Sequence, residues 1–369
     1  MKYYIIAGEA SGDLHGANLI KKLKKKDPSA NIRCWGGDLM KAAGGTLVKH
    51  YKERAFMGFT EILKNIFKIL GLLKFCKKDI DFFNPDALIF IDNSGFNLRI
   101  AKWAKPKGYQ THYYISPQVW ASRSGRVKTI KATIDHMYVI LPFVKVFYDS
   151  YDYKVNYVGH PLIDAIANFP KINSKKFKKA FNLDERPIVA LLPGSRKQEI
   201  TKMLQTMLTL PDLYPQFQFV IAGAPSHEAS FYKAIIGKKP VTLIQNRTYE
   251  ILSVAYSALV TSGTATLETA LFKVPQVVCY KGSAISYAIA KRIIKLKYIS
   301  LVNLVMDKPV VKELIQDDFT AENIKKEFDV ISDQQKRTSL FLDYYDLELK
   351  LGSTGASKKT AELIIKTLQ

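Results

Sequence analysis

Short apolar runs alternate with glycine-rich or polar loops and helical patterns through the first half of the chain. Strand-like runs occupy residues 3–7, 31–35, 86–91, 111–115 and 137–141. The run DALIFI, residues 86–91, is of the continuous apolar kind that is typical of parallel strands buried on both faces. Behind the first run, residues 13–26 have the apolar periodicity of a helix. This repeated order of strand, loop and helix predicts an α/β fold with a doubly wound parallel sheet.

The same order begins again after residue 170. Residues 171–187 are polar and rich in lysine, which favours a domain linker. Further strand-like runs lie at 188–192, 217–222, 241–244, 258–261 and 276–280, and residues 320–369 have helical patterns. We therefore expect two Rossmann-like domains, residues 1–170 and 171–344, that face each other across a cleft. Because ligands of such sheets bind at the carboxyl ends of the strands, the loops after the strands are the candidate sites.

The composition limits the classes of partner and the cellular compartment that we expect for this protein. A net charge of +22 suits phosphorylated substrates or an anionic membrane surface, although a lysine-rich proteome would explain it equally well. No signature of a nucleic-acid-binding module is present, so we expect no nucleic-acid partner. No apolar run of about 18 residues is free of charge, the first residues lack a secretory pattern, and three scattered cysteines do not form a disulfide or zinc framework. We expect a cytoplasmic protein without a metal ion or another cofactor.

Two loops of the second half have the residues of a nucleotide-sugar site. In SGTATLETA, residues 262–270, Ser262 can cap a helix and Gly263 lets a ligand approach the backbone. The free N–H groups of that first turn, at Thr264 and Ala265, suit a pyrophosphate, and Glu268 suits ribose hydroxyls. A capped helix with a surface glutamate fits the same residues equally well.

The stretch LLPGSR, residues 191–196, favours the functional interpretation. Gly194 and Ser195 begin another helix, and Arg196 would direct a permanent cation into the same crevice. Such a cation can stabilise a leaving diphosphate without a metal ion. The alternative, a plain surface arginine, is disfavoured by its position at a strand end.

Two loops of the first half contain carboxylates at strand ends. Asp92 follows the strand-like run 86–91, where it either caps the helix that begins near Asn97 or acts as a catalytic base; capping is the commoner role. The first loop, AGEASGDLHG at residues 7–16, combines three glycines, two carboxylates and a serine. This composition indicates a loop that holds a ligand as well as turning the chain.

Residues 56–76, FMGFTEILKNIFKILGLLKFC, are strongly apolar with lysines between. Such a segment suits a helix or helix pair at a membrane interface. A helix packed on the sheet is the alternative for part of it, but the apolar surplus exceeds one packed face.

Through these stretches the chain resembles the lipid A disaccharide synthase family. The members of this family are two-domain glycosyltransferases of the GT-B type. The resemblance is carried by AGEASGDLHG, AFMGFTEIL, YYISPQVWA, VILPF, YVGHPLID, LLPGSR, SGTATLETAL, YISLVNLV and KELIQ. It implies an inverting hexosyltransferase of lipid A and lipopolysaccharide biosynthesis. The implied donor is UDP-2,3-diacylglucosamine, the acceptor is 2,3-diacylglucosamine 1-phosphate, and the products are UDP and a β-1,6-linked tetraacyl disaccharide 1-phosphate.

The resemblance also implies roles for the candidate residues. Asp92 corresponds to the family's essential aspartate and is the candidate base, and Arg196 would stabilise the leaving UDP. The UDP-sugar would contact Gly194, Ser195, Arg196, Ser262, Gly263, Thr264, Ala265, Glu268 and Asn303. The acceptor side of the cleft would be lined by Glu9, Ser11, Gly12 and Asp13. Because both carboxylates of this loop would repel the acceptor's phosphate, at least one of them is expected to bind sugar hydroxyls or brace the loop.

A membrane-associated enzyme follows from the same resemblance. Contacts to the membrane or to acyl chains would come from Met57, Phe59, Ile66, Phe67, Leu70 and Leu73. The protein would be peripheral on the cytoplasmic face of the inner membrane of a Gram-negative cell, where it meets acylated glucosamine substrates. We expect the C-terminal segment 345–369 to pack back on the first domain, and the oligomeric state stays open.

Three stretches depart from the family pattern. Asn93-Ser94-Gly95 stand where the family usually has a proline and an aspartate before Phe-Asn, Ser122 replaces a tryptophan, and Val144 replaces a glutamate. These changes bear on acceptor or acyl-chain preference more than on the reaction. Two other functions stay open: another GT-B UDP-sugar enzyme, such as an epimerase, and a non-catalytic membrane-surface protein that binds UDP-sugars or anionic lipids.

Overall fold

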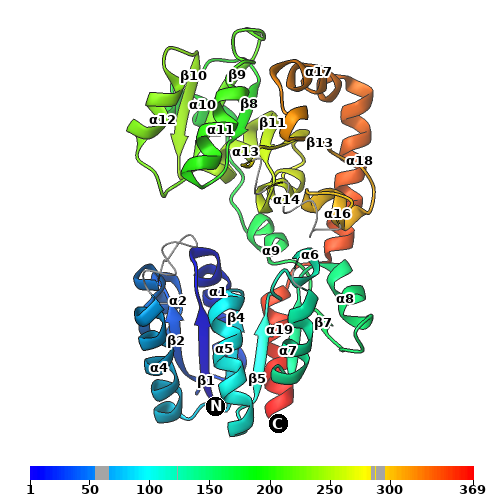
Figure 1. Cartoon of the computed structure of the whole chain (residues 1–369). Helices are drawn as coiled ribbons and strands as arrows, with labels where there is room; N and C mark the ends of the chain where they lie inside the picture. The colour runs from blue at the N-terminus through cyan, green and yellow to red at the C-terminus, as the bar shows by residue number, and fades with distance from the viewer. Residues whose placement is uncertain (55–65, 123, 284–286, 288–295) are drawn as a thin grey trace. The chain divides into compact units, whose positions relative to one another are not determined.

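The computed structural model describes residues 1–54, 66–122, 124–283, 287 and 296–369 (Figure 1). The chain forms two compact units. The first contains Met1–Asp164 and Ser353–Gln369, and the second contains Ala165–Gly352. The first boundary therefore lies at residue 164, earlier than the predicted division at residue 170. The predicted cleft between the two units stays a prediction.

A seven-stranded parallel sheet forms the centre of the first unit, in the order β3-β2-β1-β4-β5-β6-β7. Its strands are β1 (Lys2–Ala7), β2 (Asn31–Gly36), β3 (Thr46–His50), β4 (Ala87–Ile91), β5 (Thr111–Tyr114), β6 (His136–Val139) and β7 (Asn156–Tyr157). The central strands β1 and β4 are almost fully buried, as their uninterrupted apolar sequences predict. The strand order changes direction between β1 and β4, which makes this point the topological switch of the sheet.

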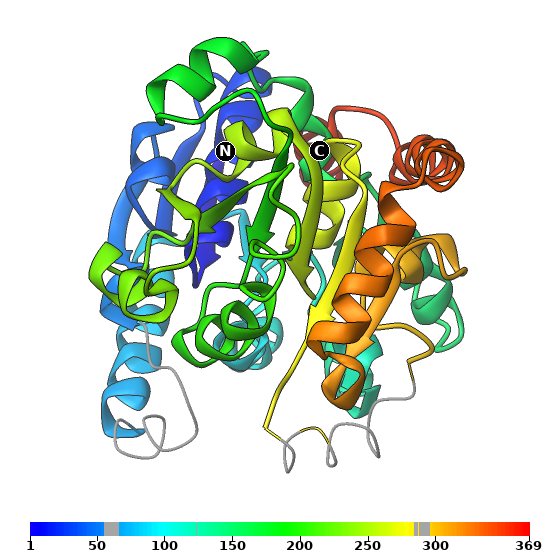
Figure 2. The same cartoon turned by 90° about the horizontal axis from the view of Figure 1, so that it is seen from above.

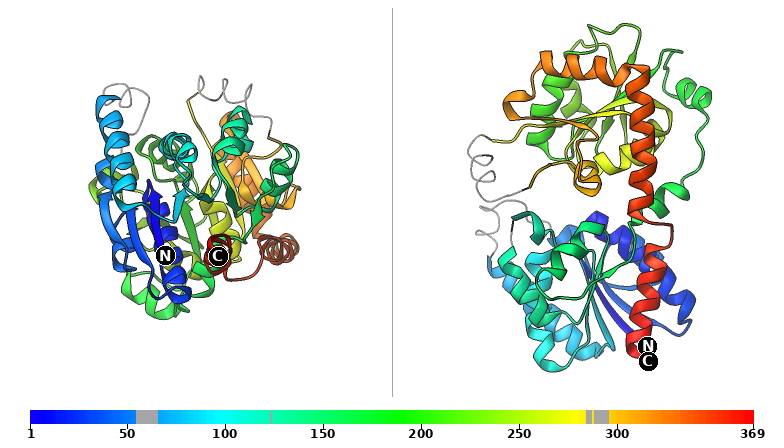
Figure 3. Two further views of the ribbon diagram at one scale, coloured as in Figure 1. Left: turned by 90° about the horizontal axis from the view of Figure 1, so that it is seen from below. Right: turned by 90° about the vertical axis from the view of Figure 1, so that its right-hand side faces the viewer.

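Helices surround this sheet (Figure 1). They are α1 (Ala10–Lys26), α2 (Asp38–Ala42), α4 (Ile66–Phe83), α5 (Ser94–Ala104), α6 (Val119–Ser122), α7 (Val127–Thr133), α8 (Pro142–Asp149) and α19 (Ala356–Leu368), with short 3-10 turns at Tyr51–Arg54, Lys105–Lys107 and Ser124–Arg126. Helix α9 (Pro161–Ala167) contains the boundary between the two units. Helix α19 packs beside α1, as the right panel of Figure 3 shows, and its residues Ala361 and Ile364 join the core. The segment 353–369 thus belongs to the first unit, whereas residues 345–352, which were predicted to accompany it, lie in the second.

The second unit repeats the topology with six parallel strands in the order β10-β9-β8-β11-β12-β13. The strands are β8 (Ile188–Leu192), β9 (Gln218–Gly223), β10 (Val241–Gln245), β11 (Ala255–Thr261), β12 (Gln276–Tyr280) and β13 (Lys312–Ile315). Its switch point lies between β8 and β11. Two Rossmann-like doubly wound units are confirmed.

Helices lie on both faces of the second sheet (Figure 2). They are α10 (Ser174–Ala180), α11 (Lys197–Met207), α12 (Ala229–Ile236), α13 (Thr248–Val254), α14 (Thr264–Leu271), α16 (Leu301–Met306), α17 (Ala321–Ser332) and α18 (Gln334–Leu351), with a 3-10 turn at Gln316–Asp318.

Helix α10 corrects the predicted linker at residues 171–187. The Asn173 side chain caps this helix by accepting a hydrogen bond from the Lys176 N–H at 3.0 Å. Phe177 is buried in the core of the second unit. Ile172, Phe181 and Leu183 pack against the same core, so these apolar residues make the lysine-rich segment part of the domain.

Candidate active site

The first-unit switch point brings two predicted loops together. Strands β1 and β4 pair in register, with Ala7 opposite Ile91, so the loops that follow them begin side by side. A Cβ atom on Gly8 would lie only 2.1 Å from the Asn93 Nδ2 atom, and therefore only glycine permits this approach. Glu9 and Asp92 consequently belong to one site.

Asp92 lies in a turn with unusual backbone geometry. Its φ is 45° and that of Asn93 is 43°, so two successive non-glycine residues are left-handed. Helix α5 begins at Ser94, and Asn93 is its N-cap residue. Asp92 is therefore not the helix cap, which removes the commoner of the two predicted roles and favours a chemical one.

The surroundings of Asp92 favour its protonated form. Desolvation raises the pKa of Asp92, and the negative charge of Glu9 raises this pKa further. The Asn93 N–H, which bonds to the Asp92 carboxylate, lowers the pKa by a smaller amount. Because Asp92 still exposes surface to solvent, water screens part of the charge effect. A base with a raised pKa accepts a proton more readily near neutral pH.

Asp13 does not line a binding site, which corrects the prediction that it binds acceptor. It is 3% exposed, and its carboxylate accepts hydrogen bonds from the backbone N–H groups of Gly37, Leu39 and Met40 at 2.7, 3.1 and 3.0 Å. These N–H groups begin α2, so Asp13 fixes that helix to α1. Of the two roles expected for a carboxylate of this loop, binding sugar hydroxyls or bracing the loop, Asp13 has the second.

The remaining residues of the first loop differ in accessibility. Helix α1 begins at Ala10, with Glu9 as its N-cap residue, so Ser11 and Gly12 lie in its first turn rather than before it. Glu9 and Ser11 are exposed, whereas Gly12 is buried and packs on Ala7 and Ile91. Glu9 and Ser11 are the loop residues that a ligand can reach.

The second-unit switch point brings together the loops after β8 and β11. Gly194 has a φ of 102°, and a Cβ atom there would lie 3.5 Å from Thr261 at the end of β11. Arg196 is the N-cap residue of α11. Its side chain is 76% exposed and forms an ion pair of 3.3 Å with Glu199. Ser195 and Arg196 thus present polar and cationic groups at the edge of the sheet where ligands bind.

In the loop after β11, the residue that caps the following helix differs from the predicted one. Gly263, with a φ of 152°, is the N-cap residue of α14, whereas the Ser262 hydroxyl donates to the Ile299 carbonyl at 3.0 Å. Ser262 therefore does not cap the helix. Thr264 is exposed and Ala265 is half-buried in the first turn, and no side chain caps α14 in the part of the chain that the structure describes.

Glu268 lies one turn further along α14, as predicted. The Tyr249 hydroxyl donates to its Oε1 atom at 3.0 Å, which fixes the side chain. Burial raises the pKa of Glu268, and the tyrosine bond lowers it by less. A half-buried, oriented carboxylate of this kind is suited to accept hydrogen bonds from a sugar.

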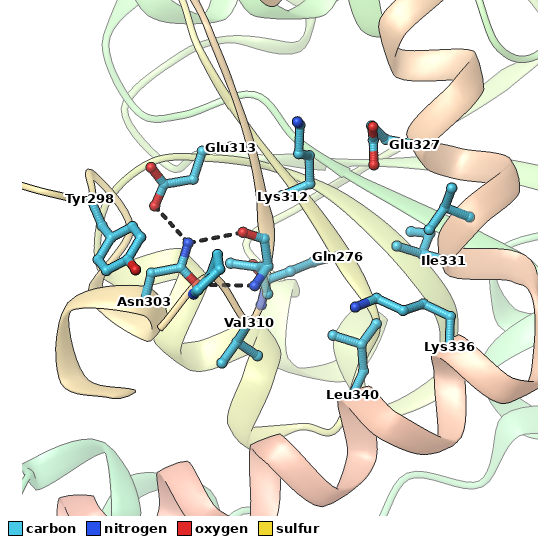
Figure 4. Close-up of a pocket in the computed structure, with 13 residues that line it drawn as sticks. Gln276, Tyr298, Asn303, Val310, Lys312, Glu313, Glu327, Ile331, Lys336 and Leu340 are labelled. Atoms are coloured by element: carbon cyan, nitrogen blue, oxygen red, sulfur yellow. Dashed lines mark hydrogen bonds between the residues drawn. The ribbon is translucent and has the colours of Figure 1, made fainter. Parts of the chain in front are cut away.

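Asn303 has a structural role instead of the predicted nucleotide contact. It is 1% exposed, and its amide exchanges two hydrogen bonds of 2.9 Å with the backbone of Val311 and donates a third to Glu313 (Figure 4). A cavity of about 260 Å³ lies beside it, lined also by Gln276, Lys312 and Lys336. Gln276 and Lys312 begin β12 and β13, so this cavity lies toward the amino ends of the strands, away from the ligand edge.

Of the three departures from the family pattern, the stretch Asn93-Ser94-Gly95 lies in the first site, directly after Asp92. The Arg126 Nη1 atom donates to the Ser94 hydroxyl at 3.0 Å, in the first turn of α5. Val144 is buried in α8, and Ser122 is the last residue of α6.

Among the described residues, no group of three or more histidine, cysteine or acidic side chains is arranged to hold a metal ion.

Sequence reasoning missed two residues at this site, Asn97 and Tyr113. Both contact the Asp92 carbonyl oxygen. The position of Asn97 five residues after Asp92 was visible in the sequence, but its side chain was read only as part of a helix.

Comparison with known proteins identifies the family. The family model described as lipid-A-disaccharide synthetase matches residues 3–364. The chain belongs to this family. The resemblance inferred from its motifs is confirmed.

Relatives of full length support the same conclusion. The lipid-A-disaccharide synthase of Syntrophus aciditrophicus is 39% identical over 374 residues, which cover 99% of this chain and 97% of the relative. That of Geobacter metallireducens is 38% identical, with 99% and 96% covered, and that of Coxiella burnetii is 37% identical, with 98% and 96% covered. The lipid-A-disaccharide synthase relatives therefore contain both units of the chain.

Solved structures of two kinds of enzyme share the fold of this synthase family member. A UDP-GlcNAc 2-epimerase from Neisseria meningitidis bound to UDP-GlcNAc has a TM-score of 0.69 at 16% identity and covers 99% of this chain and 100% of its own. The glycotransferase of kitacinnamycin has a TM-score of 0.66 at 13% identity, with 100% and 99% covered. Identities this low show the fold alone, so the epimerase likeness does not outweigh the family membership.

Proposed function

We propose that this lipid-A-disaccharide synthetase family member transfers the sugar of UDP-2,3-diacylglucosamine to the 6-hydroxyl of 2,3-diacylglucosamine 1-phosphate. The products are a β-1,6-linked tetraacyl disaccharide 1-phosphate and UDP. The observation that carries the proposal is the position of the candidate residues. Within a chain of this family, Glu9 and Asp92 meet at one topological switch point, and Arg196 and Glu268 follow the strands of the other.

The proposed reaction is one in-line displacement. The acceptor oxygen forms a bond to the anomeric carbon while the bond from that carbon to the diphosphate oxygen breaks, which inverts the α-linkage to β. Asp92 takes the acceptor's hydroxyl proton. Arg196 and the first-turn N–H groups of α14 stabilise the charge that develops on UDP, and Glu268 orients its ribose. Because a permanent cation and a helix N-terminus supply this stabilisation, we propose that no metal ion is required.

A turnover assay tests this proposal directly. The purified protein is incubated with both acylated substrates in detergent and EDTA, and UDP and the disaccharide are followed by mass spectrometry. Acceptor-dependent disaccharide would support the transferase and its metal independence. UDP release or sugar epimerisation without acceptor would indicate an epimerase instead. Binding of UDP without any turnover would indicate the non-catalytic alternative.

We further propose that the enzyme acts as a peripheral protein on the cytoplasmic face of the inner membrane, with α4 at the surface. Phe67 and Leu70 are 84% and 55% exposed on this helix, with Lys74 exposed beside them. Leu73, which was predicted to contact the membrane or acyl chains, is buried and is not part of this exposed face. Met57 and Phe59 lie outside the described residues, and Ile66 begins α4. No helix in the described ranges has the length and apolarity to cross a bilayer.

Two glutamates in place of Phe67 and Leu70 should weaken vesicle binding at least tenfold, since burying one such side chain contributes about 1.5–3 kcal/mol. Cosedimentation with vesicles that contain anionic lipid measures this change. Phe82 is equally exposed at the other end of α4, so Phe82→Glu is the matched control. Equal binding by all three proteins would refute this membrane contact.

Glu9→Gln should move the acid limb of the kcat–pH profile to lower pH. The negative charge of Glu9 raises the pKa of Asp92, and a base loses activity as pH falls through its pKa. Removing the charge lowers that pKa and extends activity downward in pH. Glu362 is an exposed glutamate on α19 that pairs with Lys26, so Glu362→Gln should leave the limb in place. A limb that does not move in Glu9→Gln would show that the two carboxylates are not coupled.

A further inference from the structure

The backbone at Asp92 is left-handed, a conformation that aspartate and asparagine tolerate better than other residues with a side chain but that still needs support. Two such residues in succession indicate that surrounding contacts hold the turn. Here two such residues, Asp92 and Asn93, follow each other directly after β4. The contacts that enforce this turn therefore also determine where the Asp92 side chain lies.

Asn97 supplies the first of these contacts. It is completely buried, and its Nδ2 atom donates to the Asp92 carbonyl at 2.8 Å and to the Ile91 carbonyl at 3.2 Å. The same nitrogen lies 3.4 Å from the Ile6 carbonyl. One buried amide thus links the ends of β1 and β4 to the turn between Asp92 and α5.

Tyr113 supplies the second contact from the neighbouring strand β5. Its ring is completely buried, and its hydroxyl donates to the same Asp92 carbonyl oxygen. Burial and the nearby charge of Asp92 raise the pKa of Tyr113 far above its ordinary value, so the hydroxyl keeps its proton throughout the working pH range. Two buried side chains, one from α5 and one from β5, therefore bind the same Asp92 carbonyl oxygen, and the Asn97 side chain also bonds to the Tyr113 hydroxyl.

We propose that Asn97 and Tyr113 are positioning residues that aim the Asp92 carboxylate at the acceptor hydroxyl. This inference rests on the proposed function, in which Asp92 is the base. Since the carbonyl of Asp92 is bound from the interior while the residue itself is exposed, the side chain is left on the open side of the turn, beside Glu9. Asn97 and Tyr113 are both completely buried, so in this proposal they act through the Asp92 turn and not through contact with a substrate.

Loss of one donor should reduce turnover more than binding. Without the Tyr113 hydroxyl the turn has one enforcing contact fewer, and residues 92–93 relax toward ordinary backbone angles. A base must lie within hydrogen-bond reach of the proton that it takes, and a displacement of about 1 Å can cost roughly 10²-fold in rate. Ground-state binding of the acceptor does not depend on that alignment, so KM should change little.

The experiment compares Tyr113→Phe with Tyr138→Phe. Tyr138 is also completely buried in the same sheet, on β6, and its hydroxyl interacts with His112 Nδ1 at 3.1 Å. The same atom is thus deleted in both variants, with a similar effect on packing. We expect Tyr113→Phe to lower kcat roughly 10- to 100-fold at nearly constant KM and to shift the acid limb of its pH profile. Tyr138→Phe should keep both parameters.

Crystal structures of the variants provide a readout that does not need activity. In Tyr113→Phe, and more so in Asn97→Ser, the Asp92 carboxylate should leave its wild-type position. Equal kcat values for the two tyrosine variants would overturn the proposal. An unmoved carboxylate in both Tyr113→Phe and Asn97→Ser would overturn it as well. Absence of turnover in the wild type would refute the proposed function, while the crystal structures would still decide whether these two residues aim Asp92.

Discussion

Asp92→Asn is expected to lower turnover about 10²- to 10⁴-fold, the range that a positioned general base contributes. UDP binding should persist, because the nucleotide residues lie on the second unit. Asparagine keeps the size of the side chain and tolerates the left-handed conformation of residue 92. The variant therefore removes the proton acceptor and little else.

The same substitution should leave the first unit as stable as the wild type, or more stable, at neutral pH. The folded-state pKa of Asp92 is raised, so folding disfavours its charged form. The resulting loss of stability is absent below the ordinary aspartate pKa of about 3.9 and complete above the raised folded-state pKa. The stability difference between Asp92→Asn and wild type should consequently grow with pH over that interval, which thermal unfolding at several pH values measures.

A second left-handed aspartate provides the control for this experiment. Asp152 has a φ of 52° and lies in the loop before β7. Asp152→Asn should keep full turnover, so a drop shared by both variants would point to an effect of the substitution on the fold. Wild-type turnover in Asp92→Asn would rule out Asp92 as the base.

The sequence predicted that the candidate site lies at the carboxyl ends of the strands, because ligands of parallel α/β sheets bind there. Once β1, β4, β8 and β11 are recognised, the loops after them must meet at the switch points of their sheets. Glu9, Asp92, Arg196 and Glu268 were found in this way. The strands β3, β7 and β13 were missed because they are short or polar edge strands, whose sequences lack the continuous apolar run that marks a buried strand.

The roles of Asp13 and Asn303 could not be predicted, because their partners come from other segments. Asp13 bonds to N–H groups at Gly37 and beyond, and Asn303 bonds to Val311 and Glu313. The backbone groups among these partners carry no sequence signature, and no spacing in the sequence marks the Glu313 carboxylate as the partner of Asn303. The sequence alone therefore does not distinguish a polar loop residue that contacts a ligand from one that is buried and bonds to the N–H groups at the start of a helix.

Asp13→Ala should destabilise the first unit by about 3–5 kcal/mol. Its buried carboxylate accepts three backbone hydrogen bonds, and its removal leaves the N–H groups at the start of α2 without an acceptor. Each unsatisfied buried group costs about 1–3 kcal/mol, and the lost side chain leaves space between α1 and α2 as well. Denaturant unfolding measures the loss, with the transition of the first unit followed separately because two units need not unfold together.

Asp38 distinguishes this structural role from a binding role. It lies in the first turn of the same helix, α2, but its side chain is 83% exposed and its ion-pair contact, to His50, is 3.6 Å long. Asp38→Ala should therefore lose far less stability, since an exposed pair contributes little. If Asp13→Ala were as stable as Asp38→Ala and instead raised the KM for acceptor, Asp13 would be a ligand contact after all. The expected outcome is that Asp13→Ala loses stability but keeps its KM for acceptor at temperatures where it stays folded. This result would show that the carboxylate binds α2 and not the acceptor.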